Sequence, residues 1–159
     1  RTNEAQAYAE WRGKRLPTHG EWMLAGRGSD GRRLPWPDAA PGVYRGNTRR
    51  EPIVRGTIAT LVDVYLSAAE SVRSSPDAAT RTGLFHMLGN VAEWTESLAP
   101  ELQDGRFQPR FHTRVVAGDA WFAANWPTRP GDLTTIGSLG PEKSYARHYI
   151  GFRCARSLD

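Results

Sequence analysis

Two short amphipathic segments open the chain and predict two helices. In the first, Thr2 or Asn3 can cap a helix whose apolar residues recur at helical spacing. We expect this helix to run to about Arg12, where Gly13 ends it. The residues that give it an apolar face are Ala5, Tyr8, Ala9 and Trp11.

The second helix begins where Thr18 and Glu21 have the spacing of a capping box, in which each side chain satisfies a backbone N–H of the first turn. We expect this helix to run to about Ala25 and to bury Trp22. His19 falls in its first turn, and we expect that histidine to be exposed on the surface.

The middle of the chain alternates between loop-forming and strand-forming composition. Residues 26–57 are rich in Gly, Pro, Arg and Asp, which predicts a long ordered loop that Trp36 fastens to the core. The β-rich run at 60–65 predicts a short strand. A short helix at 67–73 and a turn at 74–77 are expected to follow.

The stretch from Gly83 to Thr95 organises the rest of the chain, because it is apolar yet interrupted by Gly89 and Asn90. Both of these residues favour turns with positive φ, so neither a plain strand nor a plain helix fits. We expect a tight, largely buried turn, with Glu93 in a poorly solvated position where its carboxylate needs a partner. The apolar residues expected to pack around this turn are Phe85, Met87 and Trp94.

The C-terminal half predicts two further strands and two loops. Residues 112–118 and 149–155 are rich in strand-forming residues, whereas 99–109 and 127–148 predict loops. Two helices, few strands and long ordered loops indicate an α+β fold class. The length suits one domain, and we treat 1–159 as a single unit.

Composition and charge narrow the function classes. A hydrophobic fraction of 39% with 24% charged residues is typical of a globular chain. The net charge of +4 comes mainly from scattered arginines, with no basic run interleaved with aromatic residues, so nucleic-acid binding is disfavoured. The sequence shows no apolar run long enough to span a membrane and no signal-peptide pattern. Its single cysteine, Cys154, excludes an internal disulfide.

Three motifs resemble the formylglycine-generating-enzyme family, also called the sulfatase-modifying-factor domain. The segment 13–22 resembles the family's G-K-R-L-P-T-x-x-E-W, 83–95 carries its G-N-V-x-E-W-T signature, and 151–156 resembles its closing G-F-R-C-A-R. The motifs occur in the family's order over nearly the whole chain, which makes the match specific. The resemblance implies a C-type-lectin-like fold with a small twisted antiparallel core and extensive irregular structure. It also implies that an N-terminal part of the same domain precedes Arg1.

The resemblance also allows a prediction of whether this chain binds copper. Family members that oxidise a sulfatase cysteine bind copper through a cysteine pair just after an R-V-x-x-G-G-S-[WY] segment, and two soft thiolates hold Cu(I) in linear geometry. Here that segment begins at Arg114, Asp119 stands where the family usually has glycine, and the cysteine positions fall near Ala123 and Thr128. Neither of these two side chains replaces a thiolate, so we expect no bound copper and no formylglycine formation. Cys154 is expected to be a small buried core residue.

The resemblance also implies calcium at the organising stretch. The family site combines an Asn or Asp side chain at the His86 position, backbone carbonyls at Gly89 and Val91, and the carboxylate at Glu93. Hard Ca²⁺ prefers oxygen ligands, and His86 offers nitrogen instead. Two alternatives therefore stay open for Glu93, a calcium site and a pair with a buried arginine such as Arg153; we favour the arginine.

Two other metal sites are less favoured. A second family calcium site uses an Asn near Asn47 and an Asp whose position falls at Arg55, where a guanidinium would repel the ion. His86, His112 and Asp119 offer the residue types of a two-histidine, one-carboxylate iron site, but their spacing does not support one.

Two functions from different classes follow. The first is a non-catalytic module that binds a protein or small-molecule ligand, since loops displayed on a rigid base concentrate recognition residues. The second is the C-terminal, substrate-binding half of an iron-dependent oxygenase, because ergothioneine- and ovothiol-type sulfoxide synthases carry a domain of this family after a helical domain. An H-x-x-x-H-x-E pattern upstream of Arg1 would favour the oxygenase. The residues that could line a binding surface are Trp121, Phe122, Asn125, Trp126, Tyr145, Arg147 and His148.

Overall fold

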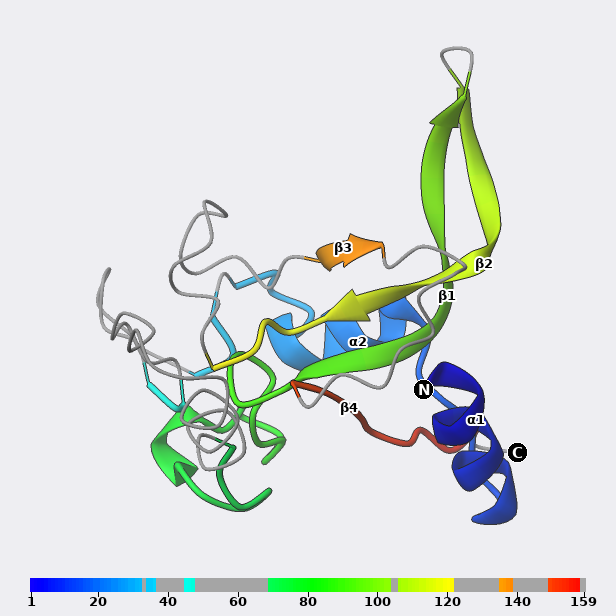
Figure 1. Cartoon of the computed structure of the whole chain (residues 1–159). Coiled ribbons are helices and arrows are strands. Elements are labelled where there is room, and N and C mark those ends of the chain that lie inside the picture. The colour runs from blue at the N-terminus through cyan, green and yellow to red at the C-terminus, as the bar shows by residue number, and fades with distance from the viewer. Residues whose placement is uncertain are drawn as a thin grey trace, which may run out of the picture.

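Over the residues that it describes, the computed structural model has two helices, one short 3-10 helix and one four-stranded sheet (Figure 1). The residues that the structure describes are 1–32, 34–36, 45–47, 69–103, 106–121, 135–138 and 149–157. The elements are α1 (Thr2–Trp11), α2 (His19–Arg27), η1 (Pro76–Ala78), β1 (Ala92–Gln103), β2 (Arg106–Ala117), β3 (Thr135–Ser138) and β4 (Ile150–Phe152). This mixture confirms the predicted α+β class.

The sheet has the order β3-β2-β1-β4, with β1 and β2 at its centre. β2 pairs antiparallel with β1 and with β3, whereas β4 pairs parallel with β1. The sheet is therefore mixed, which differs from the wholly antiparallel core that the family resemblance implied. Glu93 in β1 lies at the middle of this arrangement, because it is opposite Ala117 of β2 and Gly151 of β4.

The long β1–β2 hairpin corrects one sequence prediction. Residues 99–109, predicted as loop, form the outer ends of both strands, and the strand predicted at 112–118 begins at Arg106. The two prolines that favoured a loop, Pro100 and Pro109, face each other in register next to a β-bulge, where a strand tolerates proline. The Asp-Gly pair that separates the strands in the sequence is itself a hairpin signal.

The helix predicted near the N-terminus is present as α1, but only part of its apolar face is buried. Ala5 and Ala9 are buried, whereas Tyr8 and Trp11 are 47% and 75% exposed. Phe152 of β4 is also exposed and packs edge-on to Tyr8 with ring centroids 5.6 Å apart. Tyr8 also contacts Trp11, with ring centroids 5.7 Å apart, so these aromatic rings pack on one another at the surface.

The start of α2 follows the predicted capping box. The Thr18 hydroxyl accepts from the Glu21 N–H at 3.2 Å, and the Glu21 carboxylate accepts from the Thr18 N–H at 2.8 Å. Trp22 is buried, as expected. His19 is half-buried rather than exposed, because its backbone N–H bonds the Ser97 hydroxyl of β1 at 2.9 Å and holds the residue against the sheet. This burial lowers the pKa of His19.

Two apolar clusters lie on opposite faces of the sheet, since neighbouring residues of a strand point to opposite sides. The cluster beside α1 contains Ala5, Ala9, Leu16, Ala92, Trp94 and Val116. The cluster beside α2 contains Trp22, Trp36, Ala78, Met87, Leu88 and Ala117. The burial of Trp36 in this second cluster confirms that it fastens its loop to the core.

The segment before the organising stretch differs in part from the sequence prediction. The helix predicted at 67–73 is absent from its described part, 69–73, which is irregular. The turn at 74–77 is present, and Ser75 adopts a φ of 54° just before η1. The strands or loops predicted at 60–65 and over most of 26–57 and 127–148 lie outside the described residues, except that β3 replaces loop at 135–138.

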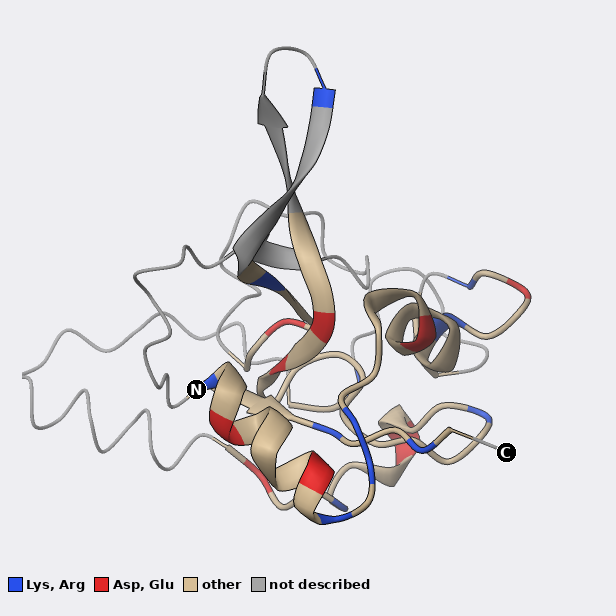
Figure 2. Ribbon diagram, turned by 90° about the vertical axis from the view of Figure 1, so that its right-hand side faces the viewer, with Lys and Arg blue, Asp and Glu red and all other residues tan. Residues whose placement is uncertain are grey.

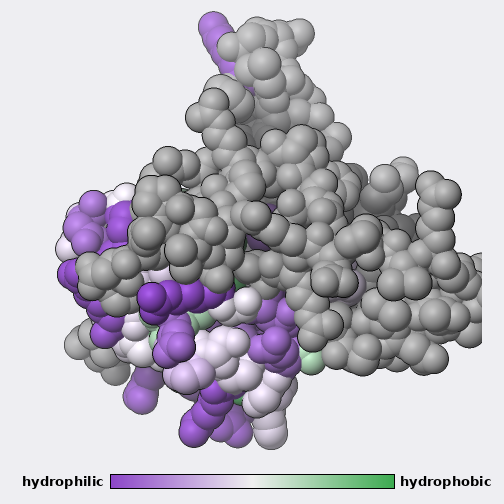
Figure 3. Space-filling view, turned by 90° about the vertical axis from the view of Figure 1, so that its left-hand side faces the viewer, coloured by the Kyte–Doolittle hydropathy of each residue, from purple (hydrophilic) through white to green (hydrophobic). Residues whose placement is uncertain are grey.

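Charges on the described residues are scattered. Figure 2 shows acidic and basic positions interspersed along the ribbon, with no continuous basic stripe on the part that is described. On the face seen in Figure 3, the described residues are mainly hydrophilic or neutral. Among the described helices, none combines the length and the apolar character needed to cross a membrane.

Candidate functional site

The organising stretch forms the predicted turn, and four of its residues, Gly83 included, have left-handed backbone. φ is 52° at His86, 83° at Gly89 and 62° at Asn90. Glycine and asparagine tolerate this region, whereas histidine visits it at a cost. Met87 is fully buried beneath the turn, while Phe85 is only half-buried. The predicted turn is thus confirmed, and it delivers the chain directly into β1.

Glu93 lies where the turn joins β1, and its carboxylate is almost fully buried. Arg153 binds both of its oxygens, with Nε 2.5 Å from Oε2 and Nη2 2.7 Å from Oε1. The indole N–H of Trp22 donates to Oε2 at 2.8 Å. Arg153 also donates to the Phe85 carbonyl at 2.9 Å, which joins the turn to the same ion pair. The structure therefore confirms the predicted pairing of Glu93 with Arg153.

The register of the sheet explains this pairing. Glu93 is opposite Gly151 of β4, and Arg153 follows two residues later, directly after the end of β4 at Phe152. A side chain at Gly151 would come within 3.0 Å of the Val91 side chain, so the absence of one lets β4 lie close to the turn. Trp22 approaches from α2, which covers this face of the sheet. Three segments distant in sequence thus converge on one carboxylate.

The calcium alternative can be compared with this geometry. Both oxygens of Glu93 already accept charge-assisted hydrogen bonds, and a guanidinium stands where a cation would approach. His86 presents Nε2 to the Ser71 carbonyl at 3.0 Å, so it adds no oxygen ligand. The donors present fit an arginine better than Ca²⁺. Binding of calcium at Gly89, Val91 and Glu93 stays a prediction for solution measurement.

Asn90 ties the turn to two loops. Its side-chain oxygen accepts from the Glu70 N–H at 2.7 Å and from the Asn47 side-chain amide at 3.1 Å. Its amide nitrogen donates to the Glu70 carbonyl at 3.3 Å. Because the backbone of Glu70 is bonded to Asn90, it does not enter the helix predicted for this segment. Asn47, named for the second calcium site, is buried here, and Arg55 lies outside the described residues.

His86 fastens the same loop a second time. Its Nε2 lies 3.0 Å from the Ser71 carbonyl and 3.3 Å from the Ser74 hydroxyl. A carbonyl only accepts, so Nε2 is the donor in the contact with Ser71. The Ser74 hydroxyl is also 2.8 Å from the carboxylate of Glu70. These contacts fix the loop and leave His86 with a structural role.

Asp119 ends the β2 strand in an unusual way. It follows Gly118, and both residues have left-handed backbone, with φ of 94° at Gly118 and 51° at Asp119. A side chain at Gly118 would come within 2.7 Å of the Trp22 ring, so only glycine fits there. The carboxylate of Asp119 is half-buried, and this desolvation raises its pKa to about 6.

The remaining predicted site residues divide into described and undescribed ones. Trp121 is buried, and its backbone N–H donates to the Asn90 carbonyl at 3.0 Å. The others predicted to bind ligand, Phe122, Asn125, Trp126, Tyr145, Arg147 and His148, lie outside the described residues, as do Ala123 and Thr128. Cys154 is half-buried rather than fully buried and packs against the cluster beside α1.

The described part of the chain offers no group of three His, Cys, Asp or Glu side chains that could hold a metal ion. The side chain of His112 lies outside the described part, so the trio of His86, His112 and Asp119 is not tested here. Sequence reasoning missed two features, the Trp22–Glu93 hydrogen bond and the solitary Asp119 carboxylate. The replacement of a family glycine by Asp119 was the available signal for the second.

Comparison with known proteins agrees with the family resemblance of the three sequence motifs. The chain matches the sulfatase-modifying factor enzyme 1-like domain over residues 1–158. It is 33% identical to the formylglycine-generating enzyme of Thermomonospora curvata, covering 98% of this chain and 44% of that protein. It is 34% identical to the inactive C-alpha-formylglycine-generating enzyme 2 of Mus musculus, covering 98% of this chain and 47% of that one. The chain thus spans about half the length of these relatives.

Two further proteins are similar to this chain. The hercynine oxygenase of Mycolicibacterium thermoresistibile is 35% identical over 80% of this chain, which covers 29% of that protein. The crystal structure of CarF superposes with a TM-score of 0.53 at 24% identity, covering 91% of this chain and 47% of CarF, and supports the fold. With the whole chain matched, the protein belongs to the family of sulfatase-modifying factor enzyme 1-like domains.

Proposed function

We propose that this domain is a binding module that has lost the formylglycine-forming reaction of its family. The observation that carries the proposal is the cysteine content. The family's copper chemistry needs two thiolates, and the chain has one cysteine. That cysteine, Cys154, follows β4 and packs against the cluster beside α1, in the closing motif rather than in the segment after β2.

Two observations support this reading. The mouse relative, whose name describes it as inactive, is a precedent for family members without the reaction. The buried Glu93–Arg153 pair and the Asn90 contacts hold a rigid base, on which the segment after β2 is mounted. A rigid base with long connecting segments suits recognition. The ligand surface that we propose is the aromatic and polar set after β2, beginning with Trp121.

The test is a Cu(I) competition titration against a chromophoric chelator, combined with mass spectrometry of a cysteine-containing sulfatase peptide after incubation in air. We expect the parent to retain no stoichiometric copper and to leave the peptide cysteine unchanged. The matched control is the double variant Ala123→Cys and Thr128→Cys, which restores the thiolate pair and should bind Cu(I) more tightly than the parent. One equivalent of copper on the parent after dialysis, or formylglycine in the peptide, would refute the proposal.

A second candidate is the substrate-binding half of an iron-dependent oxygenase. The similarity to a hercynine oxygenase favours it, although the match covers 80% of this chain and 29% of that protein. Isothermal titration with hercynine separates the two candidates. Saturable binding of hercynine by the chain would favour the oxygenase, whereas the binding-module proposal predicts no heat beyond dilution.

A further inference from the structure

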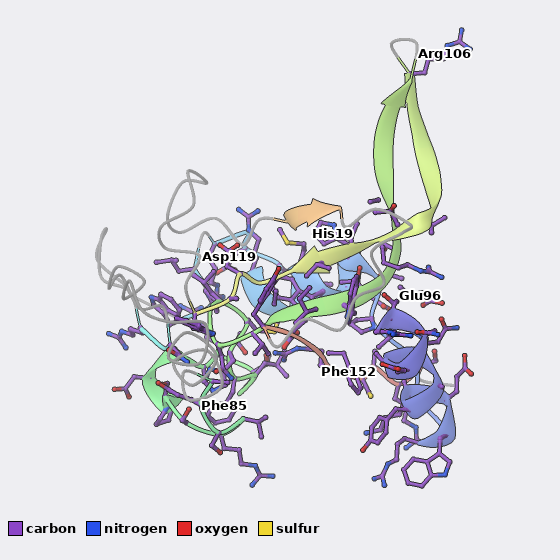
Figure 4. All side chains as sticks on the ribbon, viewed as in Figure 1. His19, Phe85, Glu96, Arg106, Asp119 and Phe152 are labelled. Carbon is purple, nitrogen blue, oxygen red and sulfur yellow. The ribbon has the colours of Figure 1, made fainter. Side chains whose placement is uncertain are left out.

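Three aromatic side chains form a ridge on the surface beside α1. This aromatic ridge consists of Tyr8 and Trp11 from α1 and Phe152 from β4, and all three rings are exposed. Tyr8 lies at its centre, with ring centroids 5.7 Å from Trp11 and 5.6 Å from Phe152. Figure 4 shows Phe152 on the side of β4 toward α1. Contiguous exposed apolar surface of this kind marks interaction sites, whereas single exposed apolar residues do not.

The composition of the aromatic ridge is typical of the centre of a protein–protein interface. Arg12 directly follows α1, and its guanidinium lies 5.6 Å from the centroid of the Trp11 ring. Tryptophan, tyrosine and arginine are the residues that most often carry the binding energy at such centres. The core does not use these rings, because α1 contributes Ala5 and Ala9 to the apolar cluster instead. The ridge is therefore accessible to a partner.

The charges beside the aromatic ridge indicate which partner fits. Glu4, Tyr8 and Arg12 are spaced four residues apart, so they follow one face of the helix and its C-cap. An acidic residue thus lies on one side of Tyr8 and a basic residue on the other. A second copy of α1 lying antiparallel across Tyr8 would bring each Glu4 opposite the partner's Arg12. A parallel copy would bring like charges together, which is unfavourable.

The charge of Glu4 is not committed to the fold. Its carboxylate pairs with the terminal ammonium of Arg1 at 2.7 Å, and both groups are more than half exposed, so this pair contributes little to stability. The other acidic residue of α1, Glu10, lies on the opposite face of the helix, where Gln6 donates to its carboxylate at 3.0 Å. Glu10 would not meet a copy docked on the ridge, so it serves as a control position.

We propose that the aromatic ridge is a self-association surface, on which α1 of a second copy of this chain lies antiparallel and centred on Tyr8. The rings of the two copies pack against each other, and two Glu4–Arg12 pairs flank them, as a two-fold axis requires. A helix of 10 residues covers less area than a standard interface, so the dimer is weak and reversible. This surface is separate from the ligand surface proposed after β2, and either proposal can fail without the other.

Sedimentation velocity over a series of concentrations measures the association directly. We expect the parent to shift from monomer to dimer as its concentration rises. Trp11→Ala removes the most exposed ring of the ridge and should weaken dimerisation by about 10-fold or more. Because that ring lies outside the core, circular dichroism should show an intact fold. Glu10→Arg, on the opposite face of α1, should dimerise like the parent.

Charge reversal tests the antiparallel arrangement. Glu4→Arg and Arg12→Glu each bring like charges together, so each variant alone should stay monomeric. An equimolar mixture of the two should form a mixed dimer, because one copy then carries two basic positions and the other two acidic ones.

Three results would overturn the proposal. A parent that is monomeric at every concentration would leave the aromatic ridge to a partner other than this chain. Dimerisation that Trp11→Ala leaves unchanged would place the contact elsewhere on the molecule. Charge-reversal variants that dimerise alone as well as the parent, or that fail to combine when mixed, would exclude the antiparallel pairing across Tyr8.

Discussion

Two carboxylates, those of Glu93 and Asp119, lie near the same end of the β1–β2 pair. Both are shielded from water, but they differ in their hydrogen-bond partners. Glu93 is opposite Ala117, and Asp119 follows that residue by two positions. Glu93 is bound on both oxygens by Arg153 and on one by Trp22, whereas Asp119 has no partner in the described part of the chain. The first arrangement is what a fold uses for its own stability. The second leaves the loss of hydration without compensation, which raises the pKa of Asp119.

The largest expected effect on the free energy of unfolding comes from removing Arg153, the partner of Glu93. Arg153→Met leaves the buried Glu93 carboxylate with only the Trp22 N–H, and we expect a loss of about 3–5 kcal/mol in the free energy of unfolding. Urea denaturation followed by circular dichroism measures this. The matched control is Arg15→Met, because Arg15 and Glu21 form a similarly short but more exposed pair, which contributes little to stability. A cost for Arg153→Met no larger than the control's would contradict the account.

A smaller effect on stability is expected at Asp119, and its size depends on pH. Its pKa is raised from 3.8 to about 6, so the folded state favours the protonated carboxyl. The resulting stability is complete below the unfolded value of 3.8 and is lost as the pH rises through about 6. Because the side chain is partly exposed, we expect the parent to lose about 1–2 kcal/mol relative to Asp119→Asn between about pH 4 and pH 7.

Urea denaturation of both proteins at several pH values tests this prediction. Asp77→Asn serves as the control, since its exposed carboxyl should leave the pH profile of the parent unchanged. A stability difference between the parent and Asp119→Asn that stays constant across this range would show that Asp119 is not desolvated.

The sequence predicts the features that depend on neighbouring residues. It does not predict the contacts between residues that are far apart in the chain. The capping box of Thr18 and Glu21 and the left-handed turn at Gly89 and Asn90 depend on neighbouring residues, so both could be predicted. The partner of Glu93 was foreseeable only as an arginine with one favoured candidate. The Trp22 contact joins residues 71 apart in the sequence and follows from how α2 packs on the sheet.

Two predictions that rested on local sequence signals were wrong, because packing in the fold had the larger influence. Pro100 and Pro109 favoured a loop, yet their opposed positions beside a bulge let both strands continue. Tyr8 and Trp11 were expected inside because of helical spacing, but spacing does not show whether a partner surface is wide enough to cover large rings. The isolation of Asp119 is likewise a property of three-dimensional packing.

The smallest expected effect is none at all, and it tests the central claim that Glu93 obtains its counter-charge from within the chain. The measurement is the melting temperature of the parent and of Glu93→Gln, first in EDTA and then with Ca²⁺ added back. We predict that the parent melts within about 1 °C under both conditions, because Arg153 already occupies the carboxylate, while Glu93→Gln melts lower in both. A parent that is destabilised by EDTA and restored by Ca²⁺, with no such response in Glu93→Gln, would contradict the claim and place calcium at this turn.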